Sequence, residues 1–122
     1  MYTIFVYGSL KRGQLLHGAL IDQKFLGLAT TCLEYALFDC GEYPALVKVA
    51  ANGDAVKGEL YRVDSICLQK LDQIEGVDEG LYVREPVSLQ DAGEYPDGPN
   101  RVWAWFYLHS IHGLRRCGSE WP

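Results

Sequence analysis

Short apolar segments, rich in β-branched and aromatic residues and separated by glycine, proline and asparagine turns, constrain the fold of this chain most strongly. Such segments are typical of β-strands. Because the connections are short, we expect a mixed or mainly antiparallel sheet that curls into a small β-barrel of about six or seven strands. The predicted strands lie within residues 1–10, 25–38 (two strands), 45–50, 56–63, 81–89 and 101–108.

One main helix is predicted at residues 65–74. Asp64 is suited to cap its N-terminus, because its carboxylate can accept hydrogen bonds from the free N–H groups of the first turn. Gly76 is placed to end it. Residues 15–22 carry apolar side chains at the spacing of a shorter helical piece. The fold class is therefore α+β, with the helices outside the barrel. The apolar stripe of the main helix consists of Cys67, Leu68, Leu71 and Ile74.

The connections carry their own sequence features. Residues 52–54, Asn-Gly-Asp, are typical of a hairpin. Pro86 implies an edge strand or a bulge, because proline has no N–H to donate. Residues 91–100 form a polar loop with two prolines and two glycines, and residues 109–122 form a tail that must lie on the surface or cover something.

The composition limits the class of protein. The 122 residues suit a single domain, 1–122, and the 48% apolar content can form a core. A net charge of −5 argues against a nucleic-acid partner. No signal peptide or membrane span is evident, so we expect a cytoplasmic protein without a membrane partner.

Neither a metal nor a cofactor is expected. The cysteines lie far apart in sequence, without a Cys-x-x-Cys pair, and are interpreted as reduced thiols. His109 and His112 lack a third ligand, so a metal site is disfavoured. No phosphate-loop or dinucleotide-binding motif is present. The cysteines are Cys32, Cys40, Cys67 and Cys117.

The first candidate site is the turn that follows the opening strand. The strand stops at Gly8, which lets the backbone turn sharply and lets another molecule approach. A tight turn at Gly8 and Ser9 leaves several backbone N–H groups pointing outward. Such a nest suits an anion or a developing oxyanion. The alternative is an ordinary junction between a strand and a turn.

Glu75 is the candidate catalytic residue. It falls in the last helical turn, just before Gly76, where the negative end of the helix dipole disfavours a carboxylate. Partial burial would disfavour its ionised form further, and both effects raise its pKa toward the range of a general base. The alternative is that Glu75 lies on the solvated face of the helix. Asp78 and Glu79 lie in the following loop and are expected to be solvated.

Tyr82 and Arg84 are candidate substrate-binding residues. They lie two positions apart on one face of a predicted strand. A phenol and a guanidinium that project together could hold a carboxylate or position a base. The alternative is that both are structural residues of the sheet.

A set of short motifs, each weak alone, occurs in a specific order along nearly the whole chain. Together they resemble the gamma-glutamylcyclotransferase-like superfamily, which includes gamma-glutamylamine cyclotransferases and avirulence-induced-gene-like proteins. An aromatic strand at residues 102–107 completes the resemblance. The motifs are Tyr7-Gly8-Ser9-Leu10, Tyr43-Pro44-Ala45-Leu46, Gly58-Glu59-Leu60-Tyr61, Leu71-Asp72-Gln73-Ile74-Glu75-Gly76, Tyr82-Val83-Arg84 and Gly118-Ser119-Glu120-Trp121.

The resemblance implies a small β-barrel with a cavity at its mouth and a cofactor-free reaction on a gamma-glutamyl small molecule. Members of this superfamily convert a gamma-glutamyl compound to 5-oxoproline and release an amine or amino acid. It implies substrate binding by the backbone of Tyr7, Gly8, Ser9 and Leu10, catalysis by Glu75, and a site tyrosine at Tyr82.

Two alternatives to this cyclotransferase hypothesis stay open. The same barrel could bind a small carboxylate without catalysis, or an activated water could hydrolyse the gamma-glutamyl amide and release glutamate. The sequence does not identify the leaving amine or the oligomeric state.

Overall fold

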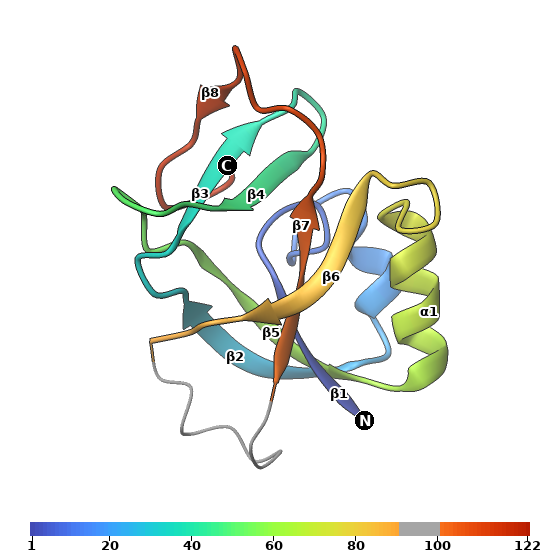
Figure 1. Cartoon of the computed structure of the whole chain (residues 1–122). Helices are drawn as coiled ribbons and strands as arrows, with labels where there is room; N and C mark the ends of the chain where they lie inside the picture. Colours follow the sequence, from blue (N-terminus) through green and yellow to red (C-terminus); the bar gives the residue numbers. More distant parts are fainter. Residues whose placement is uncertain (91–100) are drawn as a thin grey trace.

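The computed structural model describes residues 1–90 and 101–122, which form two β-sheets and two helical segments (Figure 1). The predicted loop at residues 91–100 lies outside the described residues. In chain order, the elements are β1 (Tyr2–Val6), the 3-10 helix η1 (His17–Leu20), β2 (Lys24–Thr30), β3 (Tyr35–Asp39), β4 (Pro44–Lys48), β5 (Lys57–Val63), α1 (Ser65–Ile74), β6 (Tyr82–Val87), β7 (Val102–Tyr107) and β8 (Arg115–Arg116).

The larger sheet has five strands in the order β2-β5-β1-β7-β6, and the smaller sheet has three in the order β4-β3-β8. β1 lies at the centre. It pairs antiparallel with β5, where Val6 faces Glu59, and parallel with β7, where Ile4 faces Trp103. The prediction of an α+β fold with a mixed sheet is therefore confirmed.

Neither sheet closes into a barrel among the described residues. The two edges of the larger sheet approach each other at one end, where Thr31 and Leu89 form an isolated antiparallel bridge. Cys32 N–H donates to the Ser88 carbonyl at 2.9 Å, and Gln90 N–H donates to the Thr30 carbonyl at 2.9 Å. The sheet is thus strongly curved, and the closed barrel stays a prediction.

The larger sheet is covered on both faces, and β1 shows how. Its side chains alternate between two clusters of buried residues, as the period of a strand requires. Ile4 and Val6 pack with Leu68 and Leu71 of α1, whereas Phe5 packs with residues of the smaller sheet. Figure 1 shows α1 and η1 on one side of the larger sheet and β3, β4 and β8 on the other.

The main helix forms as predicted. The Asp64 carboxylate caps α1 by accepting a hydrogen bond from Cys67 N–H at 2.7 Å. Gly76 follows the helix with a φ of 67°, a left-handed conformation that suits glycine. The predicted helical piece at residues 15–22 is only the four-residue η1. Residues 15–16 and 21–22 form turns instead.

The hairpin prediction at residues 52–54 was wrong. A turn exists there, with Asn52 at a φ of 58°. However, β4 pairs with β3, and β5 pairs with β1 and β2. The chain therefore passes from the smaller sheet to the larger one at this turn, and the local Asn-Gly preference does not determine which strands pair.

The predicted tail covers the fold. β8 pairs with β3, and Trp121 is only 8% exposed in the cluster between the two sheets. β6 lies at an edge of the larger sheet, which confirms the expectation from Pro86.

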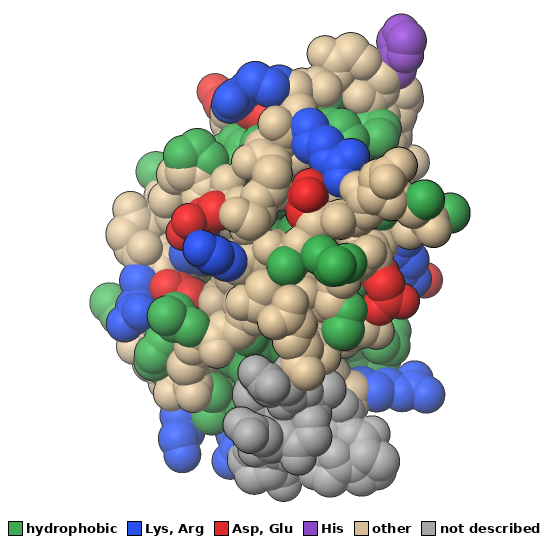
Figure 2. Space-filling model, turned by 90° about the vertical axis from the view of Figure 1, so that its left-hand side faces the viewer, with side chains coloured by type: hydrophobic (Ala, Val, Ile, Leu, Met, Phe, Trp, Pro, Cys, Tyr) green, Lys and Arg blue, Asp and Glu red, His purple; other side chains and the backbone are tan. Residues whose placement is uncertain are grey.

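Basic and acidic side chains alternate on the face shown in Figure 2, with small hydrophobic areas between them. Among the described residues, no helix combines the length and the apolar character needed to span a bilayer.

Candidate active site

A cavity of about 140 Å³ lies where β1 ends, against the C-terminal end of α1, the start of β4 and the start of β6. It brings together five of the predicted substrate-binding residues with the predicted catalytic Glu75. The lining residues are Phe5, Val6, Tyr7, Gly8, Ser9, Leu10, Leu16, Tyr43, Pro44, Ile74, Glu75, Leu81, Tyr82 and Trp105.

The turn after β1 forms one wall of this cavity. Lys11 N–H donates to the Gly8 carbonyl at 3.0 Å, and Leu16 N–H donates to the Ser9 carbonyl at 2.8 Å. These two bonds use the carbonyl groups of the turn. Within residues 1–90 and 101–122, no protein group accepts a hydrogen bond from the N–H of Gly8, Ser9 or Leu10. The turn therefore presents free donors beside the cavity, as a nest for an anion requires.

Glu75 is the residue at which α1 ends. It keeps a helical conformation (φ −80°, ψ −2°), and its N–H donates to the Leu71 carbonyl at 2.9 Å. In the part of the chain that the structure describes, its carboxylate has no hydrogen-bond or ion-pair partner. Burial raises its pKa to about 7. The predicted direction of this pKa shift is confirmed, and burial is its cause.

Tyr7 and Tyr82 flank Glu75, and both phenols are held by backbone carbonyls. Tyr7 donates to the carbonyl of Trp105, and Tyr82 donates to that of Pro44. Burial, together with the nearby carboxyl of Glu75, raises the pKa of both phenols far above the usual range. Both tyrosines therefore stay neutral. Among the described residues that line the cavity, Glu75 is therefore the one that ionises near neutral pH.

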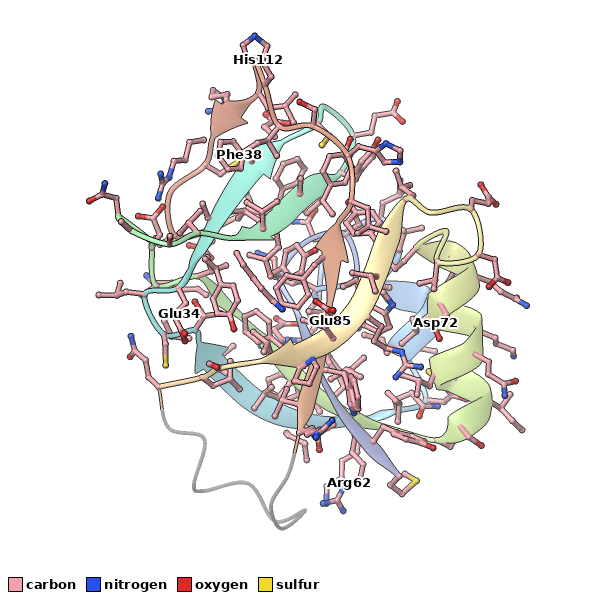
Figure 3. All side chains as sticks on the ribbon, in the orientation of Figure 1. Glu34, Phe38, Arg62, Asp72, Glu85 and His112 are labelled. Carbon is pink, nitrogen blue, oxygen red and sulfur yellow. The ribbon has the colours of Figure 1, made fainter. Side chains whose placement is uncertain are left out.

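Arg84 does not line this cavity. Its Nε donates to Oδ1 of Asp72 at 2.9 Å, and a terminal nitrogen donates to Oδ2 at 3.1 Å. Trp105 Nε1 donates to the same Oδ1 at 2.9 Å. Figure 3 shows Asp72 on the side of α1 that faces the sheet. Asp72 thus fastens α1 to β6 through Arg84 and to β7 through Trp105. The role of Arg84 in substrate binding stays a prediction.

The sequence motifs contained two cavity residues to which no role was given. Tyr43 lines the cavity and its ring lies edge-on to that of Tyr82, with 6.3 Å between the ring centroids. Pro44 packs against the turn at residue 8. Both precede or begin β4, which belongs to the other sheet, so their proximity to β1 has no local sequence signature.

The residues with metal-binding side chains do not gather. Among the described residues, no three His, Cys, Asp or Glu side chains are placed to hold a metal ion. His112 projects from the loop before β8, away from the larger sheet (Figure 3). The four cysteines are free thiols.

With this geometry in place, the chain can be compared with known proteins. The family described as "Gamma-glutamyl cyclotransferase, AIG2-like" matches residues 4–121. The chain belongs to this family of enzymes.

The relatives include proteins named gamma-glutamylaminecyclotransferase. The rat protein (Rattus norvegicus) is 41% identical over 97 residues, which cover 74% of this chain and 64% of the rat protein. The human protein (Homo sapiens) is 34% identical over 120 residues, which cover 88% of this chain and 78% of the human protein.

The fold is also shared with a solved structure. A crystal structure of an AIG2-like protein from Mus musculus superposes with a TM-score of 0.75 at 31% identity, over 98% of this chain and 87% of the mouse chain.

Proposed function

We propose that this protein is a gamma-glutamyl cyclotransferase that uses Glu75 as an acid and base, without a cofactor. Its substrate is a small gamma-glutamyl compound, and its products are 5-oxoproline and a released amine or amino acid. One observation carries the proposal. An unpaired carboxylate with a pKa of about 7 shares a small cavity with the free N–H groups of the turn at residues 8–10.

The turn is the proposed binding site for the negative charge of the substrate. Gly8, Ser9 and Leu10 offer backbone N–H groups to the α-carboxylate or to the oxyanion that forms on the γ-carbonyl. No lysine, arginine or histidine is among the residues that line the described cavity, so these donors are the groups suited to that task. Tyr7 and Tyr82 supply rigid, neutral walls.

Glu75 is placed to move the protons of the reaction. The α-ammonium must lose a proton before its nitrogen can attack the γ-carbonyl carbon, and Glu75 takes that proton. The new C–N bond closes the ring, and the bond to the leaving nitrogen then breaks. Two protons leave the attacking nitrogen and two reach the leaving group, which departs as an ammonium, so the carboxylate is regenerated. A pKa near 7 suits a group that both accepts and donates protons at neutral pH.

The ring closes within one molecule. Because the amine and the carbonyl are already tethered, the enzyme mainly has to fold the substrate so that they meet. A cavity lined by apolar and aromatic side chains also keeps water from the carbonyl carbon, which favours cyclisation over hydrolysis.

Two other functions would use the same cavity. A module that only binds a small carboxylate needs the free N–H groups but has no use for a buried carboxylate beside a bound anion, so Glu75 argues against it. Hydrolysis by an activated water would use Glu75 in the same way but would release glutamate. The cytoplasmic location stays a prediction.

Product analysis separates these functions. The purified protein is incubated with glutathione, several gamma-glutamyl amino acids and gamma-glutamyl-ε-lysine, and the products are followed by mass spectrometry. The proposal predicts 5-oxoproline and the free amine in equal amounts from at least one of these compounds. Release of glutamate would establish hydrolysis instead. Binding of 5-oxoproline without turnover of any compound would favour the binding module.

A further inference from the structure

Glu59 is a buried carboxylate that the proposed reaction does not use. It lies on β5 opposite Val6, the last residue of β1, and is only 7% exposed. Gly58 brings the two strands together at this point, because a Cβ there would lie 2.5 Å from the Val6 carbonyl oxygen. The side chain of Glu59 therefore starts close to the place where the chain leaves the sheet and enters the turn.

Both oxygens of Glu59 are occupied. Oε1 accepts hydrogen bonds from the backbone N–H of Arg12 at 2.9 Å and from the Tyr61 hydroxyl at 3.0 Å, and Oε2 accepts from Arg12 Nε at 3.2 Å. Burial alone would raise the pKa of Glu59, but the hydrogen bonds from Arg12 and Tyr61 outweigh burial and lower it. The carboxylate is therefore ionised at neutral pH, and its hydrogen bonds are charge-assisted.

Glu59 contacts the loop outside the cavity that contains Glu75. It lines a second cavity, of about 870 Å³, together with Lys11, Arg12 and Gln14. It is absent from the lining of the cavity that contains Glu75. The hydrogen bonds to Arg12 are therefore a direct route by which Glu59 can act on the turn at residues 8–10.

Other hydrogen bonds also hold this loop in place. Lys11 Nζ donates to the Trp121 carbonyl at 2.9 Å, and Gln14 Nε2 donates to the Pro122 carbonyl at 3.2 Å. These two bonds restrain side chains of the loop, whereas the His17 ring contacts its main chain, with Nδ1 3.0 Å from the Leu10 carbonyl oxygen. Glu59 is, among the described side chains, the one that accepts a backbone N–H from this loop, so it restrains the main chain itself.

We propose that Glu59 is a positioning residue. By holding the backbone of Arg12, it fixes the turn at residues 8–10 so that the free N–H groups face the substrate. This inference rests on the proposed function for its kinetic consequence. Its structural consequence can be measured without any activity.

The test compares Glu59→Gln, Arg12→Ala and the wild type. The exchange rates of the hydrogen-bonded loop amides of Lys11, Arg12, Gln14 and Leu16 are measured by NMR. Glu59→Gln should accelerate exchange at these amides about tenfold, because a charge-assisted bond to the main chain is weakened, and should leave α1 and β7 unchanged. Arg12→Ala keeps the backbone bond, so exchange at the same positions should stay within about threefold of the wild type.

The kinetic arm uses the best substrate of the wild type. If the turn binds the α-carboxylate, which is present throughout the reaction, Glu59→Gln should raise KM about tenfold and leave kcat within about threefold. Unchanged loop exchange together with an unchanged KM would overturn the proposal. Amide exchange that is accelerated equally in the loop, α1 and β7 would also overturn it, because Glu59 would then only stabilise the fold.

A titration of the wild-type protein makes the test independent of how the variants fold. When acid protonates Glu59, the amide resonances of Ser9 and Leu10 should shift in step with that of Arg12. A shift confined to Arg12 would contradict the inference. If the wild type turns over none of the gamma-glutamyl compounds, the proposed function fails while the exchange and titration data still decide the role of Glu59.

Discussion

The ring of Pro44 occupies the space where a side chain at Gly8 would begin. A Cβ on residue 8 would lie 2.2 Å from Pro44 Cγ and 2.8 Å from Pro44 Cδ. Gly8 is not among the residues with a positive φ, so the turn does not require glycine for its backbone conformation. The close approach of β4 requires it, and this contact joins the smaller sheet to the proposed substrate-binding turn.

Gly8→Ala should therefore destabilise the protein by about 1–3 kcal/mol, because the added methyl group overlaps atoms of a rigid ring. It should also lower kcat/KM by displacing the turn. Urea unfolding and steady-state kinetics measure the two effects. Gly18→Ala is the matched control, since no atom lies within 4 Å of a Cβ there and its φ is not positive. If Gly8→Ala changes neither the stability nor kcat/KM, this account of the turn is wrong.

The activity should depend on the ionisation of Glu75. Its pKa of about 7 predicts that kcat/KM falls about tenfold for each pH unit below that value, because only the carboxylate can accept the proton of the α-ammonium. A pH profile of kcat/KM between pH 5 and 8.5 tests this prediction. Replacing the exposed Glu79 with glutamine should leave the profile unchanged. A profile that is flat down to about pH 5 would exclude Glu75 as the base.

The same group makes a prediction about stability. The carboxyl of Glu75 ionises near pH 4.5 in the unfolded chain and near pH 7 in the folded protein. Between these values the folded state binds more protons than the unfolded state, so this contribution to stability is lost as the pH rises. Glu75→Gln lacks the contribution. The difference in the free energy of unfolding, variant minus wild type, should therefore rise by up to about 3 kcal/mol between pH 4 and pH 8.

Urea unfolding of the wild type and of Glu75→Gln at both pH values measures this difference. A difference in the free energy of unfolding that is the same at pH 4 and pH 8 would show that the pKa of Glu75 is not raised by folding.

Asp72 should support the position of α1, and with it that of Glu75. Asp72→Asn leaves Arg84 without its charged partner, and we expect a loss of about 1–3 kcal/mol in stability. Because Glu75 lies one turn further along α1, kcat should fall as well. Asp78→Asn, at an exposed position beyond the helix, should change neither quantity. If Asp72→Asn retains both its stability and its kcat, this ion pair does not hold the helix end.

Local features of the sequence were enough to predict the end of α1. The cap at Asp64, the apolar stripe and Gly76 all act within the helix itself, so the helix bounds could be expected from the sequence. The same holds for most strands, whose composition is local. The predicted bounds differ from the observed ones by a few residues at the ends. The pKa of Glu75 is raised by burial, which depends on the elements packed around the helix end.

The arrangement of the strands could not be predicted in this way. β1 pairs with β7, which begins about a hundred residues later, and the short β8 pairs with β3. Such partners are chosen by the burial of both faces of the sheet, which no single segment encodes. The hairpin prediction at the Asn-Gly turn after β4 failed because the strands on either side of the turn belong to different sheets.

The sequence also could not distinguish residues that line the cavity from residues that only support it. Tyr82 and Arg84 share a strand face in the sequence, but the docking of α1 places Asp72 beside Arg84 and leaves only Tyr82 at the cavity. Glu59 gave a similar difficulty. A glutamate in an alternating strand is normally solvated, and only the close pairing of β1 and β5 reveals that it is buried against the turn.

The measurement that tests the central claim most directly is the release of 5-oxoproline by the wild type and by Glu75→Gln, with Glu79→Gln as the control. The account predicts that the wild type and Glu79→Gln convert at least one gamma-glutamyl compound. It predicts that Glu75→Gln, although folded, is slower by about 100-fold or more. Equal release by the wild type and Glu75→Gln would show that Glu75 is not the acid and base, and would contradict the mechanism.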